Sequence, residues 1–308
     1  MFREKFGVLI TAMVTPFNED LSIDYKSLEK IINHLIQSGS TSILITGTTG
    51  ENPTLTHEEE WELLKKTKEI TQTIAGVNIP ILFGAGSNCT KTAVEVSQKA
   101  EELGADGILS ISPYYNKPNQ EGISAHFAEI AKGVALPIAL YNNPGRTCSS
   151  IEPETVYELN KSYPNIVAVK ESSGSLDNFT WLSLKAPNIE IYCGDDNLIL
   201  PSIAIGSHGA ISVTSHIAGA EIRSIIDLVG NDKVKEAAKI HSKLFSLFKA
   251  VFSSPSPGPI KYALSQLGLC KPYMRLPLTE PATIVRDSLR QILTDLNLNS
   301  FSGLKSLV

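Results

Sequence analysis

A lysine ends one of the most apolar runs of the sequence. Residues 166–170 read Ile-Val-Ala-Val-Lys, and polar residues follow from Glu171 onward. Four apolar residues bounded by polar ones are typical of a strand that is buried on both faces, as in a parallel sheet. Lys170 therefore lies where a buried strand meets its loop. It is either a solvated ammonium whose methylene stem covers apolar surface, or an amine that an apolar pocket keeps neutral for attack on a carbonyl carbon.

Other apolar runs also end in residues that suit chemistry on a small acid. The segment Gly47-Thr48-Thr49-Gly50-Glu51 combines two glycines with two hydroxyls, which can form a concave nest for a carboxylate. Tyr141 ends another run and can transfer protons, and Arg146, five residues later, can hold a carboxylate with its fork of donors. The structural alternatives are a Gly-rich turn, a tyrosine that caps the core and an arginine in a surface ion pair.

Two adjacent tyrosines lie between prolines in the loop Ser112–Pro118. Tyr114 and Tyr115 are either packing or interface residues, or phenols that relay protons when they contact a neighbouring hydroxyl. The six histidines include no HExxH motif and no clustered set, so we expect no metal site.

The element that ends at Lys170 is one of eight similar apolar runs, with amphipathic segments between them. Eightfold alternation of strand and helix predicts an α/β protein with a (β/α)8 TIM barrel, whose active site lies at the carboxyl ends of the strands. The expected strands are 8–14, 42–46, 79–83, 107–111, 137–141, 166–170, 189–193 and 209–213.

Helix signals support the same division. Residues 24–38 place apolar side chains at helical spacing, Thr56 and Glu59 form a capping box, and Pro153 suits the first turn of a helix over 152–163. Further helices are expected over 218–229, 232–252 and 257–267. We therefore expect a barrel domain over 1–220, a C-terminal helical appendage over 221–296 and a loose tail over 297–308.

Composition limits the classes of partner. The 308 residues carry a net charge of -5 and no basic block, which argues against nucleic acid and membrane surfaces and favours small molecules. No segment is long enough to cross a membrane, and the apolar start of the chain is interpreted as a first strand. The four cysteines form no CxxC pair, which fits reduced thiols in the cytoplasm.

Taken together, the motifs resemble those of the dihydrodipicolinate synthases, members of the class I aldolase group that includes N-acetylneuraminate lyase. The resemblance runs from about Phe6 to Leu296. The matching motifs are GTTGE at 47–51, SPYYNKP at 112–118, YNNPGRT at 141–147, VKESSG at 169–174, GDDN at 194–197 and GAISVT at 209–214.

The resemblance implies a lyase of the diaminopimelate and lysine biosynthetic pathway that condenses pyruvate with L-aspartate 4-semialdehyde. It needs no cofactor, because a lysine forms the covalent imine with pyruvate. By position, Lys170 matches the Schiff-base lysine and Tyr141 the proton-transferring tyrosine. Thr49, Tyr115 and Thr48 match relay residues, and Arg146 matches the residue that holds the semialdehyde carboxylate. Gly194 and Ile211 match backbone positions that line the pyruvate site.

The same resemblance implies a homotetramer built as a dimer of dimers, with Tyr115 reaching the neighbouring active site. A candidate allosteric lysine site matches Asn52, His57, Asn88 and Tyr114, together with Glu60 and Thr92. Strongly inhibited relatives tend to carry a histidine at the position of Glu60 and a glutamate at that of Thr92. We therefore expect weak or absent inhibition by lysine.

Two other functions stay open. N-acetylneuraminate lyases and 2-keto-3-deoxy sugar acid aldolases share the lysine and the tyrosine, but generally lack an arginine at the position of Arg146. A barrel that only binds a small acid and regulates a partner is a second alternative, although binding alone needs no nucleophile.

Overall fold

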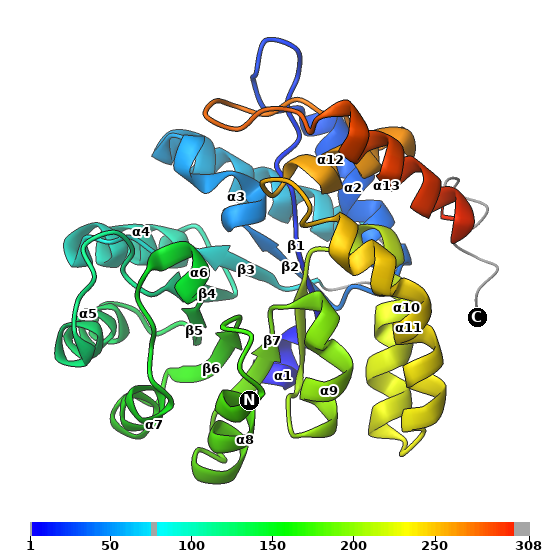
Figure 1. Cartoon of the computed structure of the whole chain (residues 1–308). Helices are drawn as coiled ribbons and strands as arrows, with labels where there is room; N and C mark the ends of the chain where they lie inside the picture. The colour runs from blue at the N-terminus through cyan, green and yellow to red at the C-terminus, as the bar shows by residue number, and fades with distance from the viewer. Residues whose placement is uncertain (1, 75–78, 299–308) are drawn as a thin grey trace.

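Eight parallel strands close into a barrel in the computed structural model, which describes residues 2–74 and 79–298 (Figure 1). Each strand pairs with its neighbours in chain order, and β8 pairs with β1. This arrangement confirms the predicted (β/α)8 fold. The strands are β1 Leu9–Ala12, β2 Ser42–Ile45, β3 Ile81–Gly84, β4 Gly107–Ile111, β5 Ile138–Asn142, β6 Ile166–Glu171, β7 Glu190–Cys193 and β8 Gly209–Ser212.

The strands are covered on both faces. Every residue of β1, β2, β3, β5, β7 and β8 is buried. Side chains fill the inside of the barrel and helices cover the outside, so the strands are continuous apolar runs rather than alternating ones. This is why the sequence located each strand to within two residues at either end.

Helices follow the strands, and side chains cap the first turns of α2 (Tyr25–Gln37) and α3 (His57–Thr73), the second of these as predicted. The side chain of Asp24 accepts hydrogen bonds from the first turn of α2, and Thr56 and Glu59 form the capping box of α3. The helices around the barrel are α2 Tyr25–Gln37, α3 His57–Thr73, α4 Thr90–Glu102, α5 Gln120–Gly133, α6 Pro144–Thr147, α7 Pro153–Ser162, α8 Leu176–Lys185, α9 Ile199–Ala204 and α10 Ser215–Gly230.

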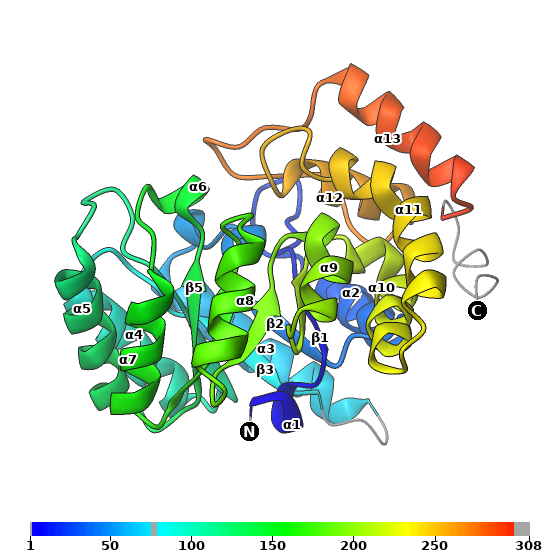
Figure 2. The same cartoon turned by 60° about the horizontal axis from the view of Figure 1, so that its bottom comes forward.

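A short N-terminal helix, α1 Phe2–Phe6, covers the end of the barrel where the strands begin. Figure 2 shows α1 at the opposite end from α6. Phe2 and Phe6 are buried, and their rings stack 4.3 Å apart between centroids. The Tyr192 hydroxyl donates to the Gly7 carbonyl over 2.7 Å, so the inside of the barrel is closed at this end. The sequence predicted no helix before the first strand.

Three helices follow α10 and lie beside the barrel: α11 Val234–Ala250, α12 Gly258–Gln266 and α13 Thr283–Asp295. α11 and α12 pack on α10, and α13 packs on α11 and α12. The predicted boundary at residue 220 falls inside α10, and the division into barrel, helical appendage and tail stays a prediction. The predicted tail lies outside the described residues from 299 onward. Within the described part of the chain, no helix is both long and apolar enough to span a membrane.

Candidate active site

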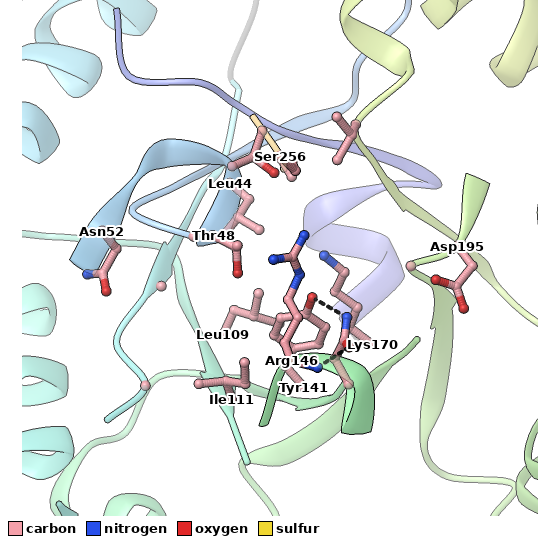
Figure 3. Close-up of a pocket in the computed structure, with 18 of the residues that line it drawn as sticks. Leu44, Thr48, Asn52, Leu109, Ile111, Tyr141, Arg146, Lys170, Asp195 and Ser256 are labelled. Carbon is pink, nitrogen blue, oxygen red and sulfur yellow. Dashed lines mark hydrogen bonds between the residues drawn. The ribbon is translucent and has the colours of Figure 1, made fainter. Parts of the chain in front are cut away.

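A cavity of about 580 Å³ opens at the carboxyl ends of the strands. Its wall is formed by residues of the barrel strands and of the loops that follow them (Figure 3). Residues of α11 complete it. Six of the residues singled out from the sequence as catalytic or substrate-binding contribute to this wall, namely Thr48, Thr49, Tyr141, Arg146, Lys170 and Gly194. The barrel thus brings together side chains that are up to 146 positions apart in the sequence.

Lys170 and Tyr141 lie side by side because β5 and β6 are neighbours in register, with Tyr141 opposite Lys170. The Lys170 Nζ atom lies 4.4 Å from the centroid of the Tyr141 ring. Both side chains are only 6% exposed. The next residue, Glu171, is held by Asn142, whose Nδ2 donates to a Glu171 carboxylate oxygen over 2.9 Å. The ends of both strands are therefore fixed directly beside the lysine.

Asn143 positions two of these groups, although the sequence analysis did not single it out. Its side-chain amide donates to the Tyr141 hydroxyl over 3.1 Å, and its side-chain oxygen accepts from the Arg146 backbone N–H, also over 3.1 Å. The sequence signal is an asparagine directly before a proline, which is a favoured way to begin a helix. Asn143 is the N-cap of the short helix α6, which carries Arg146.

The first loop of the site is a 3₁₀ turn over Thr48–Gly50. Thr49 is buried and Thr48 is half-buried in the cavity wall. The Gly50 N–H donates to the Gly47 carbonyl over 3.0 Å, and Thr15 donates to the Gly50 carbonyl over 2.7 Å, which closes the turn. The relay from Thr49 to Tyr141 stays a prediction.

Two carboxyl groups lie close to the lysine after β7. Asp195 lines the cavity, and burial raises the pKa of its carboxyl, with the Lys170 ammonium acting in the opposite direction. Burial also raises the pKa of Asp196, although the Thr214 hydroxyl donates to its Oδ2 over 2.6 Å. Gly194 permits close packing, because a Cβ atom there would lie 2.7 Å from the Lys170 Cε.

Two predicted site residues lie away from the cavity wall. The Tyr115 side chain is 86% exposed, and its backbone is left-handed with φ of 74°. Ile211 is fully buried in β8, where it pairs with Ile10. A role for Ile211 through its backbone and a role for Tyr115 at a subunit interface both stay predictions.

The candidate allosteric residues do not all share one set of contacts. Asn52 and Tyr114 contribute to the same cavity wall as Lys170. Asn52 and His57 both hydrogen-bond to the Glu60 carboxylate, and the His57 contact is 2.8 Å long. Burial raises the pKa of Glu60, with the two hydrogen-bonding partners opposing the change. Asn88 makes a separate contact: its carbonyl accepts a hydrogen bond from the Asn116 side chain over 2.9 Å.

Part of the cavity wall was missed from the sequence. Phe248 and Lys249 of α11, and Phe252 and Ser256 after it, face the cavity across from the barrel loops. They lie more than fifty positions after the GDDN motif, and no local pattern marks them. Among the described residues, no group of three or more His, Cys, Asp or Glu side chains could hold a metal ion.

Comparisons with known proteins agree on one family. Residues 5–296 match the model of the dihydrodipicolinate synthetase family. The chain is 47% identical to the 4-hydroxy-tetrahydrodipicolinate synthase of Thermosynechococcus vestitus, over 95% of this chain and 98% of that one. The crystal structure of the lysine-bound synthase of Cyanidioschyzon merolae superposes with a TM-score of 0.91 at 42% identity, covering 95% of this chain and 99% of the other.

A third relative has been solved as a complex with a small keto acid. The structure of the dihydrodipicolinate synthase of Acinetobacter baumannii, which is described as chloride-inhibited and complexed with pyruvate, has a TM-score of 0.90 at 36% identity. The match covers 94% of this chain and 99% of that chain.

Proposed function

The chain belongs to the dihydrodipicolinate synthetase family, and from this premise we propose that it is a 4-hydroxy-tetrahydrodipicolinate synthase. It is a lyase that condenses pyruvate with L-aspartate 4-semialdehyde in the diaminopimelate route to lysine. One observation supports this chemistry most directly. A buried lysine and a tyrosine lie side by side, with the Lys170 Nζ 4.4 Å from the Tyr141 ring centroid, in the wall of a cavity large enough for two small acids.

The reaction begins at Lys170. Its neutral amine adds to the ketone carbon of pyruvate, and loss of water gives an iminium. The iminium withdraws electrons from the adjacent methyl group, which loses a proton and leaves an enamine. The enamine carbon then bonds to the aldehyde carbon of the semialdehyde. The amine of that substrate attacks the imine carbon, which closes the ring and releases Lys170. No metal or organic cofactor takes part in this scheme.

Each proton in this sequence needs a group that can accept and return it. We assign this role to the Tyr141 hydroxyl, which the Asn143 amide holds, with Thr48, Thr49 and Tyr115 as relay residues. Groups of this kind typically contribute about 10²- to 10⁴-fold to the rate.

Orientation is assigned to two parts of the cavity wall. The Thr48–Gly50 turn holds the carboxylate of pyruvate, and Gly194 and Ile211 contribute backbone to the same site. Arg146 holds the carboxylate of the semialdehyde through its fork of donors.

Assembly and location complete the proposal. We assign a homotetramer, in which the exposed Tyr115 of one subunit reaches the active site of a partner. The four free cysteines fit a cytoplasmic enzyme with reduced thiols.

Borohydride trapping tests the proposed nucleophile. Incubation with pyruvate and borohydride should add one reduced pyruvate to the intact mass, and peptide mapping should place it on Lys170. Lys249 is a matched control, because it is a second lysine in the same cavity wall. The Lys249→Met variant should still form the adduct, and Lys170→Met should not. An unchanged mass for the wild-type protein would refute the Schiff-base mechanism and leave a barrel that only binds a small acid.

Substrate competition tests the second half of the proposal. Turnover of pyruvate with L-aspartate 4-semialdehyde should be far faster than cleavage of sialic acid or of 2-keto-3-deoxy sugar acids. Equal or reversed rates would assign the chain to the sugar-acid aldolases instead.

A further inference from the structure

A buried ion pair connects the first active-site loop to the C-terminal helices. Glu51 directly follows the Thr48–Gly50 turn, and its carboxylate pairs with the ammonium of Lys261 on α12. Both side chains are completely buried. The two residues are 210 positions apart in the sequence. No step of the proposed reaction uses either group.

The backbone of Glu51 connects the ion pair to the residues that face the cavity. Its backbone N–H donates to the Thr48 carbonyl over 3.1 Å, and its carbonyl accepts from the Thr54 N–H over 2.9 Å. Its φ of 56° is in the left-handed region, which is unfavourable for a residue with a side chain. The side-chain contacts of Glu51 are therefore needed to hold this backbone conformation, and with it the turn that carries Thr48 and Thr49.

Arg275 adds contacts to the same loop. The backbone N–H of Arg275 donates to the other carboxylate oxygen of Glu51 over 3.2 Å. The Arg275 guanidinium also donates to the Thr54 carbonyl over 2.8 Å and pairs with Glu59. Lys261 and Arg275 both lie over the Phe17 ring, 4.1 Å and 4.6 Å from its centroid.

Lys261 itself has few alternative partners. Its ammonium donates to the Tyr273 carbonyl over 2.8 Å besides pairing with Glu51. Burial lowers its pKa, while the Glu51 carboxylate acts in the opposite direction. A buried ammonium without its carboxylate is strongly unfavourable, so each member of the pair fixes the other in place.

We propose that Lys261, through its buried ion pair with Glu51, is a positioning residue that holds the Thr48–Gly50 turn in the geometry that binds the carboxylate of pyruvate. This inference rests on the proposed function. The C-terminal helices thus contribute residues to the cavity wall and also control the part of the site that selects the keto acid.

Steady-state kinetics of Lys261→Met, Glu51→Gln and the double variant test the proposal. Lys261→Met should raise the KM for pyruvate at least about tenfold while the KM for the semialdehyde changes less than about twofold. A purely structural role would lower the amount of active enzyme and hence kcat, and would leave both KM values unchanged. In the double variant the rise in KM should not exceed that of either single variant, because both substitutions remove one contact. Additive rises, or an unchanged KM for pyruvate, would overturn the proposal.

Arg290→Met is the matched control. Arg290 of α13 donates to the Tyr262 hydroxyl over 2.6 Å, so it makes a polar contact to α12 that does not reach the loop. Its KM for pyruvate should equal that of the wild type. If a single variant fails to fold, the double variant decides the matter, because it leaves no buried charge unpaired.

Hydrogen exchange gives a readout that does not depend on catalysis. Amides of residues 47–52 should exchange faster in the double variant than in the wild type or in Arg290→Met, and equal exchange would refute the proposed positioning. A wild-type protein that forms no pyruvate adduct would refute the proposed function instead, and this exchange result would still stand.

Discussion

Gly194→Ala should slow the reaction with pyruvate by moving Lys170 rather than by unfolding the chain. A Cβ atom at position 194 would lie 1.9 Å from the Ser172 Oγ, 2.7 Å from the Lys170 Cε and 3.1 Å from the Lys170 Cγ. The Ser172 hydroxyl can rotate away, because it has no hydrogen-bond partner among the described residues. The Lys170 Cε can give way only by carrying the bonded Nζ with it.

The size of the effect follows from these distances. Ordinary contact begins at 3.4 Å, so the Lys170 Cε must move by about 0.7 Å. A displacement of about 1 Å of a reacting group typically costs about 10²-fold in rate. We therefore expect the pyruvate adduct to form about 10- to 100-fold more slowly. The overpacking should also reduce the free energy of unfolding by about 1–3 kcal/mol.

The assay compares adduct formation with stability in matched variants. Adduct formation is followed by intact mass after borohydride quenching, and the free energy of unfolding by urea denaturation. Gly230→Ala is the control, because a Cβ atom there meets nothing within 4 Å at the end of α10. It should form the adduct at the wild-type rate. If a folded Gly194→Ala protein forms the adduct at the wild-type rate, residue 194 does not control the position of Lys170.

Three further predictions follow from buried groups and from the rim of the cavity. Burial lowers the pKa of His216 to about 4. Between pH 6.5 and pH 4 the unfolded chain therefore binds more protons than the folded protein, and the free energy of unfolding decreases as the pH falls. Between pH 7 and pH 5 the wild-type protein should lose about 2 kcal/mol more unfolding free energy than His216→Asn in urea titrations, and equal losses would contradict this. Burial raises the pKa of the Cys193 and Cys270 thiols to about 12 each, so neither should react with iodoacetamide at neutral pH before denaturation. Peptide mass spectrometry that finds either cysteine labelled in the native protein would contradict this expectation. Free lysine should inhibit turnover weakly or not at all, because the carboxylate of Glu60 is already hydrogen-bonded and Thr92 offers no carboxylate to the ammonium of lysine. Complete inhibition at submillimolar lysine would show that this prediction is wrong.

The barrel could be predicted because its strands are short and buried on both faces. The run that ends at Lys170 is apolar throughout, and caps such as Asp24 and Thr56 mark where helices begin. The helices α1 and α13 were not predicted. The five residues of α1 are too few to show a helical period. In α13 the apolar residues Val285, Leu289, Ile292 and Leu293 do follow a helical period, so the sequence held a signal for this helix that was missed.

The site could be predicted as far as its residues follow strands. Tyr141 and Lys170 end neighbouring strands of a parallel sheet, so their proximity follows from the topology. The contact between Glu51 and Lys261 could not be predicted in this way, because no local pattern in either segment indicates that the two residues pair. Pairing of this kind depends on how the C-terminal helices settle on the barrel, and a single sequence carries no signal for it.

The mixed origin of the cavity wall has a consequence for changing the substrate range. Lys170 and Tyr141 come from the strands, whereas Lys249, Phe252 and Ser256 come from α11 and the turn after it. A library of variants confined to these last three positions would alter the space offered to the acceptor aldehyde and leave the imine-forming pair untouched. Directed evolution toward bulkier or differently charged aldehydes can therefore begin on the appended helix, with the carbon–carbon bond chemistry kept intact.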